Sequence, residues 1–195
     1  MRNRSPDAGQ AVTVRQPNTL KKATTKRISE GKTMNQQTEH KETALLVIDV
    51  QKGLFEKSTP IYNAKQVLKN INNLINKARQ EGVPVIFIQH SSPQTLEKGS
   101  DAWQLHPDIQ PLAGEVIVHK LHGNAFEGTN LREELEKRKI SALVMMGLVT
   151  HGCVKATCLG AIDEGYKVVL VSDAHSSYSK DAAQLIEKWN QAIGK

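Results

Sequence analysis

Three residues with chemically useful side chains stand at the ends of apolar segments of this sequence: the carboxylic acid Asp49, the amine Lys120 and the thiol Cys153. A thiolate is a nucleophile, a carboxylate can take a thiol's proton, and an ammonium stabilises nearby negative charge. Each residue also has a structural interpretation. A free cysteine is often a core residue, an aspartate after a strand often caps a helix or turn, and a lysine there is usually solvated. The functional interpretation therefore requires a fold that brings all three together.

From Thr43 onward, apolar β-branched segments alternate with helical ones. The predicted strands are Ala44–Val50, Val83–Gln89, Glu115–His119, Ala142–Gly147 and Lys167–Ser172. The predicted helices are Ala64–Gln80, Asn130–Lys139, Lys155–Glu164 and Lys180–Ile193. Continuous apolar runs are typical of strands buried on both faces. The pattern therefore predicts an α/β fold in three layers, with a doubly wound, mainly parallel sheet and helices on both faces.

Ligands bind such sheets outside the carboxyl ends of the strands, where all three reactive residues are expected. Cys153 is predicted at the start of the helix after the fourth strand. Unpaired N–H groups and the helix dipole favour an anion there, which predicts a lowered pKa for its thiol. Lys120 is expected to keep Asp49 and a thiolate stable together. Cys158 is interpreted as a core residue and Asp173 as a turn or support residue after the fifth strand.

Several common types of site lack their sequence patterns. The chain has no G-x-G-x-x-G after the first strand, no G-x4-G-K-[ST], no G-x-S-x-G and no H-E-x-x-H. Its one Asp-x-His group, Asp173-Ala174-His175, has no further ligand nearby in the sequence. The sequence therefore predicts no cofactor and no metal.

The net charge of +6 in this 195-residue chain belongs to its first 33 residues, which hold eight basic and two acidic side chains. The remainder is balanced, so no nucleic-acid partner is predicted. Residues 1–42 have few apolar residues and no period, which predicts a disordered basic leader that activity does not require, before a domain at 43–195. No apolar run approaches the roughly 20 residues that span a bilayer. With no secretory signal and no disulfide framework, we expect a soluble cytoplasmic protein with no membrane partner.

Four ordered motifs resemble those of the isochorismatase-like cysteine hydrolases. They are Leu45–Gln51 (LLVIDVQ), Lys120 followed by Gly123–Leu131 (GNAFEGTNL), Gly147–Val154 (GLVTHGCV) with Thr157, Ala161 and Gly165-Tyr166 beyond it, and Ser172–Ala174 (SDA). The resemblance runs from about Thr43 to Asn190. Within it, Trp103–Pro107 (WQLHP) is similar to the streptothricin hydrolase branch. The family implies a Rossmann-like topology and a homo-oligomer, either a dimer or a tetramer.

The resemblance also implies a catalytic triad of Asp49, Lys120 and Cys153. Cys153 would attack a carbonyl carbon and form a thioester, which water then hydrolyses. Asp49 would take the thiol proton and pass it to the leaving group, and Lys120 would stabilise the thiolate. The backbone N–H groups of Val149 and Cys153 would hold the oxyanion. The peptide between Leu148 and Val149 would be cis.

Two departures from the family narrow the function. Nicotinamidases carry an Asp-x-His metal group after the second strand, where this sequence has Gln89–Pro93 (QHSSP). Isochorismatases that cleave a vinyl ether lack the nucleophilic cysteine. The sequence thus favours a metal-independent hydrolase of an amide, lactam or similar C–N bond. A vinyl ether hydrolase and a non-catalytic flavodoxin-like binding module are the alternatives.

Substrate specificity is expected to come from the loops at residues 51–63 and 90–113, whose composition encodes no particular molecule. The residues expected to line a pocket for a small-molecule substrate are Gln51, Phe55, His90 and Trp103.

Overall fold

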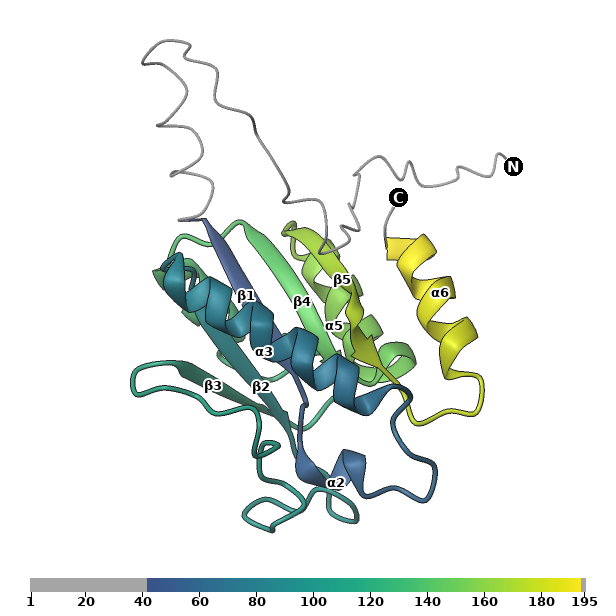
Figure 1. Ribbon diagram of the computed structural model, residues 1–195. Helices are drawn as coiled ribbons and strands as arrows, with labels where there is room; N and C mark the ends of the chain where they lie inside the picture. The colour runs from purple at the N-terminus through teal and green to yellow at the C-terminus, as the bar shows by residue number, and fades with distance from the viewer. Residues whose placement is uncertain (1–41, 194–195) are drawn as a thin grey trace, which may run out of the picture.

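The computed structural model describes residues 42–193 of the chain (Figure 1). The predicted leader at residues 1–42 lies outside the described residues, except for Glu42. The elements in chain order are β1 (Thr43–Ile48), α2 (Lys52–Phe55), α3 (Ala64–Gln80), β2 (Val85–His90), β3 (Val116–Lys120), α4 (Leu131–Lys137), β4 (Ala142–Leu148), the irregular helical turn η1 (Thr150–Val154), α5 (Lys155–Asp163), β5 (Lys167–Ser176) and α6 (Ala182–Ile193).

The five strands form one parallel sheet in the order β3-β2-β1-β4-β5. Helix α3 packs on one face, while α4, α5 and the end of α6 contribute to the core on the other (Figure 1). This arrangement confirms the predicted three-layer, doubly wound architecture.

Strand β1 shows why the apolar runs are continuous. Leu46 and Ile48 enter the core on one face of the sheet, and Leu45 and Val47 enter the core on the other. Side chains alternate across a strand, so a strand covered on both faces needs apolar residues at every position. Helix α3 needs only one apolar stripe, which buries Val67, Leu68, Ile71, Ile75 and Ala78.

The chain reverses its direction of winding between β1 and β4, which places a crevice at their carboxyl ends. Ile48 pairs with Gly147 at this point. Gly147 has φ +125°, and a Cβ on it would lie 2.0 Å from the carbonyl oxygen of Ile48. Only glycine fits, because any side chain there would strike the backbone of β1. This close approach brings Asp49 beside the segment that carries Cys153.

Several boundaries differ from the predicted ones for local reasons. Strand β1 ends at Ile48 rather than Val50 because Asp49 has a left-handed backbone with φ +50°. Strand β2 begins after Pro84, which has no N–H to donate to a sheet. The predicted turn at Asp173 is wrong. A register shift beside Gly147 lets β5 continue to Ser176, which pairs with Leu148.

Candidate active site

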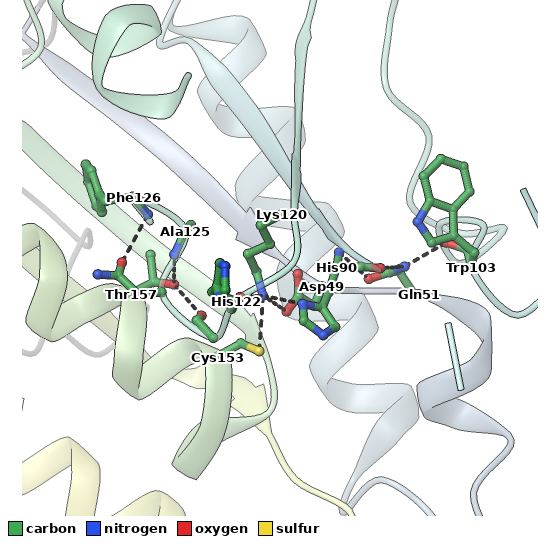
Figure 2. Close-up of polar contacts among 12 residues, drawn as sticks. Asp49, Gln51, His90, Trp103, Lys120, His122, Ala125, Phe126, Cys153 and Thr157 are labelled. Carbon is green, nitrogen blue, oxygen red and sulfur yellow. Dashed lines mark hydrogen bonds and ion pairs between the residues drawn. The ribbon is translucent and has the colours of Figure 1, made fainter. Parts of the chain in front are cut away.

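The ammonium of Lys120, the last residue of β3, lies at the centre of the site. Its Nζ is 2.8 Å from Asp49 Oδ2, 3.1 Å from Cys153 Sγ and 3.2 Å from His90 Nδ1 (Figure 2). It also donates to the carbonyl oxygen of His122 at 3.1 Å. Four neighbouring segments thus deliver one polar group each, because the carboxyl ends of parallel strands meet at one edge of the sheet. The three reactive residues predicted from the sequence lie in contact.

Asp49 is buried almost completely, with 1% of its surface exposed. Its carboxylate forms a short ion pair with Lys120 and also interacts with the side chain of Cys153. A left-handed backbone is uncommon for a residue other than glycine and often marks a functional position. Burial raises the pKa of Asp49, and the nearby Lys120 opposes that rise. The carboxylate is therefore a buried proton acceptor beside the thiol.

The pKa of Cys153 differs from the sequence-based expectation. Cys153 lies within the irregular turn η1 rather than at the first turn of α5, and its side chain is half-buried. Burial, together with the negative charge of Asp49, raises the thiol pKa to about 12, although Lys120 acts in the opposite direction. The predicted lowering is wrong, because desolvation outweighs the ammonium. The thiol is therefore protonated at neutral pH, and a negative charge on sulfur is unfavourable beside Asp49.

One ligand atom each of Asp49, His90 and Cys153 lies within 4.8 Å of the others, which is a donor set that also suits a metal ion. The ammonium of Lys120 contacts all three donor atoms. A fixed cation of the protein therefore already lies beside all three side chains. The three donor atoms suit the Lys120 ammonium. That the protein needs no metal stays a prediction.

The loop after Lys120 is tied to α5 by Thr157, which is fully buried. The hydroxyl oxygen of Thr157 accepts a hydrogen bond from the N–H of Ala125 at 3.1 Å, and the hydroxyl donates to the carbonyl of Gly123 at 3.4 Å (Figure 2). Farther along, the Thr129 hydroxyl donates to the Ala125 carbonyl at 2.6 Å. The GNAFEGTNL segment therefore has a structural task, which is to hold the chain that carries the His122 carbonyl against Lys120.

Gln51, which was expected to line the substrate pocket, is instead fully buried. Its amide nitrogen donates to the carbonyls of His90 and Trp103, at 2.9 and 2.7 Å, and its amide oxygen accepts from the N–H of His90 at 2.8 Å. These bonds join the end of β1 to the end of β2 and to the loop that follows it. Gln51 therefore holds the backbone around the site and does not line a substrate pocket.

The aromatic residues predicted for the pocket lie in two places. Phe55 packs against the cluster that contains Leu148 and Val149, close to the turn that carries the thiol. Trp103 stacks on His119 with ring centroids 5.3 Å apart, and its indole N–H donates to the Ser91 hydroxyl at 2.8 Å. The cavity beside it, about 550 Å³, also includes Ile117 of β3 in its lining but none of the three reactive residues. Trp103 thus lines a different hollow from the one expected.

Most of the chain is similar to one family of known proteins. The model of the Isochorismatase domain matches residues 43–190. The chain belongs to the isochorismatase family. Among curated relatives, the uncharacterized isochorismatase family protein YrdC of Bacillus subtilis is 33% identical over 138 residues, which cover 69% of this chain and 74% of YrdC. A streptothricin hydrolase of Streptomyces noursei is 32% identical over 142 residues, covering 72% of this chain and 51% of that protein.

A crystal structure of an isochorismatase family protein superimposes with a TM-score of 0.75 at 33% identity, covering 80% of this chain and 95% of the other. The family resemblance stated from the motifs is therefore confirmed, and the chain is a hydrolase of this family.

The Leu148–Val149 peptide is cis, as the resemblance implied. Cys158 is fully buried, as predicted. Among the described residues, no helix combines the length and apolar character needed to cross a bilayer.

A polar network behind the thiol was missed from the sequence of this isochorismatase-family chain. His175 of β5 is 1% exposed, and its Nδ1 is 2.9 Å from the Thr150 hydroxyl while its Nε2 is 2.9 Å from Asn190 Oδ1. The Asn190 amide nitrogen donates to the Ser172 carbonyl, which fixes Oδ1 as the atom that faces the ring. Nε2 therefore carries the proton, and Nδ1 accepts from Thr150. The network joins α6 to the turn η1. Its residues are distant from one another in the sequence, so no local motif predicts it.

His175 makes the stability of the protein dependent on pH. Burial lowers its pKa, so it stays neutral in the folded state, whereas it titrates near about 6.5 when unfolded. The unfolded state then binds more protons as the pH falls below that value, so this contribution is complete above it and declines below it. We expect the free energy of unfolding in urea to fall more steeply between pH 7 and 5 in the wild type than in His175→Gln, by up to about 1.4 kcal/mol per pH unit. Equal slopes would contradict this assignment.

Proposed function

We propose that the protein is a cysteine-dependent hydrolase that cleaves an amide, lactam or similar C–N bond of a small molecule through a thioester acyl-enzyme. The observation that carries the proposal is the contact of Lys120 Nζ with both Cys153 Sγ, at 3.1 Å, and Asp49 Oδ2, at 2.8 Å, at the crevice between β1 and β4. A carboxylate and an ammonium with about 1% exposure are costly to bury, and packing alone gives no reason to keep them there.

In the proposed reaction, Cys153 Sγ forms a bond to the substrate carbonyl carbon while its proton passes to the Asp49 carboxylate. The carbonyl electrons move to oxygen, and the backbone N–H groups of Val149 and Cys153 hold that oxyanion. As the C–N bond breaks, Asp49 returns the proton to the leaving nitrogen. Water then attacks the thioester, with Asp49 again as the base, and releases the acid and the thiol. Lys120 keeps its charge throughout and stabilises sulfur while it is anionic.

The pKa values in the site support this order of events. Because the thiol pKa is about 12, Cys153 is protonated at rest and needs a base during attack. Burial raises the pKa of Asp49, which strengthens it as a proton acceptor. Moving the proton from sulfur to the carboxylate keeps the number of charges in the buried site constant. A general-base route therefore suits this pocket better than a preformed thiolate.

Amide cleavage is favoured over the alternatives by the identity of the residues present. A vinyl ether hydrolase has no use for a thiol in contact with the ammonium, and a non-catalytic module has no use for the buried ion pair. The names of two relatives point to the same class: the streptothricin hydrolase of Streptomyces noursei and nicotinamidase 3 of Arabidopsis thaliana, which is 28% identical over 154 residues. A metal-dependent nicotinamidase is less well supported, because Gln89–Pro93 (QHSSP) stands where nicotinamidases carry their Asp-x-His metal group.

The proposal is tested by a screen of small neutral amides, lactams and carbamoyl compounds, with intact-mass detection after rapid acid quench. We expect at least one member to be hydrolysed and to leave its acyl group on the peptide that contains Cys153. Ready turnover without an adduct on that peptide, under conditions in which deacylation limits the rate, would contradict the covalent route. The cytoplasmic location and the dimer or tetramer stay predictions.

A further inference from the structure

A hollow of about 550 Å³ lies on the face of β3 opposite the three reactive groups. Side chains alternate across a strand, and Val118 and Lys120 project from one face of β3 into the core and the active site. Ile117 and His119 therefore project from the other face, where they line the hollow. On that face α3 packs with residues of β1, β2, β4 and β5, and the loop that carries Trp103 lies over β3. The hollow is thus separate from the proposed catalytic site.

The lining of the hollow contains a buried polar atom that the protein does not satisfy. Gln89 of β2 is only 3% exposed and belongs to the lining. Its amide nitrogen donates to the Trp103 carbonyl at 2.8 Å, which fixes the orientation of the amide. Within residues 42–193, no hydrogen bond reaches its amide oxygen, Oε1. Because a buried acceptor costs free energy until a donor binds it, this atom indicates a ligand that carries a hydrogen-bond donor.

The walls of the hollow are flat and firmly held. Trp103 stacks on His119 with ring centroids 5.3 Å apart. Its indole N–H donates to the Ser91 hydroxyl at 2.8 Å, and its carbonyl accepts from the amides of both Gln51 and Gln89. The apolar part of the lining is completed by Leu105, Pro107, Pro111 and Ile117. Trp103 is therefore fixed at its ring and at its backbone, as in a binding site that is formed before its ligand arrives.

The charges around the hollow favour a neutral ligand. The ammonium of Lys52 belongs to the lining, and it forms an ion pair with the carboxylate of Asp101. Burial and the positive charge of Lys98 lower the pKa of His119, so its ring is neutral at pH 7. An anion or a cation would lose its hydration here without gaining an unpaired opposite charge.

We propose that this hollow binds a small, neutral, planar molecule, of the class of N–H heterocycles and aromatic amides, that donates a hydrogen bond to Gln89 Oε1. The volume lies within the range of small-molecule sites in proteins. The site goes beyond the hydrolase function proposed above and does not depend on it, because Asp49, Lys120 and Cys153 are not part of its lining.

The test follows the fluorescence of Trp103 in the full-length protein, with Trp189→Phe removing the only other tryptophan of the sequence. The probe is benzimidazole, which is planar, neutral in mildly alkaline buffer and a donor through its N–H. It has no amide bond that the proposed hydrolase could cleave. N-methylbenzimidazole is the matched probe without a donor. We expect saturable binding of benzimidazole, about threefold to tenfold tighter than that of its methylated form, which is the effect of one neutral hydrogen bond.

Two substitutions locate the binding. Gln89→Met removes the acceptor, keeps the length of the side chain and should make the two probes bind equally. Ile117→Phe should fill the hollow and weaken the binding of benzimidazole by about tenfold or more. Leu112→Phe is the matched control, since Leu112 is also an exposed apolar residue but lies outside the lining, and it should change nothing. Thermal unfolding shows that each variant is folded before it is titrated.

Three results would overturn the proposal: no saturable change of Trp103 fluorescence, equal dissociation constants for the two probes in the wild type, or a preference that survives Gln89→Met. Sedimentation velocity of Ile117→Phe gives a fourth. If this substitution changed the mass in solution and left probe binding intact, the hollow would be a contact between copies of the chain. Turnover enters none of these measurements, so their failure leaves the hydrolase proposal standing, and loss of that proposal leaves this site standing.

Discussion

Replacing Cys153 with alanine is expected to lower turnover of any amide substrate by about four orders of magnitude or more, because Cys153 is the group proposed to form the acyl-enzyme. The substitution removes a half-buried thiol and leaves the ion pair of Asp49 and Lys120 intact. The measurement is kcat/KM with a substrate found in the amide screen. The substrate dissociation constant should change little, since the thiol acts in the transition state rather than in binding.

The second cysteine supplies a matched control. Cys158 lies in α5, the helix that follows the turn with Cys153, and is fully buried in the core. Its sulfur lies 3.3 Å from Met145 Sδ. Cys158→Ala should cost about 1 kcal/mol of stability and leave turnover near the wild-type value. If Cys153→Ala also kept full activity, the nucleophile assignment would be refuted and ether cleavage without a thiol would become the better interpretation.

Asp49→Asn is expected to lower turnover while it raises the reactivity of the Cys153 thiol. Without a base, turnover should fall by about 10²–10⁴-fold. The negative charge of Asp49 is one cause of the raised pKa of Cys153, while Lys120 lowers it. Removing that charge therefore lowers the thiol pKa and increases the thiolate fraction near neutral pH by about tenfold for each unit of pKa, which speeds alkylation by iodoacetamide by a smaller factor. Alkylation rates across pH, localised to Cys153 by peptide mass, measure this effect.

Asp173→Asn is the matched control for this substitution. Asp173 is also an acid near the carboxyl end of a strand with a raised pKa, but it is not among the groups that contact Lys120 or Cys153. It should leave both turnover and alkylation unchanged. If Asp49→Asn slowed alkylation together with turnover, the resting enzyme would depend on Asp49 to hold a thiolate, and the general-base route would be wrong.

The fold was predictable because the sheet is buried on both faces, which gives its strands continuous apolar runs in the sequence. Five apolar runs at near-regular spacing admit few arrangements other than a covered parallel sheet, and the rule for strand ends then places Asp49, Lys120 and Cys153 together. Boundaries were less predictable. The ends of β1 and β5 depend on one left-handed residue, Asp49, and on a register shift beside Gly147, and neither has a hydrophobic signature.

The electrostatics of the site were not predictable from residue types. Placing Cys153 near a helix start argued for a low thiol pKa, but the amount of water removed depends on packing by segments distant in the sequence. The tasks of Gln51 and His90 were hidden for a similar reason. Both looked like pocket residues by position, and only their hydrogen bonds show that one fixes the backbone and the other meets the ammonium.

Because Gly147 has no side chain, its position can help to recognise related chains from sequence alone. Aspartates, lysines and cysteines at strand ends are common, so their presence says little about whether two neighbouring strands approach closely enough to join them. A side chain at this position would strike the carbonyl of Ile48. A glycine aligned with the last residue of the first strand, a few positions before the cysteine, is therefore a more discriminating marker for this architecture than the reactive groups themselves. A chain that keeps all three reactive residues but carries alanine there would have to separate β1 from β4.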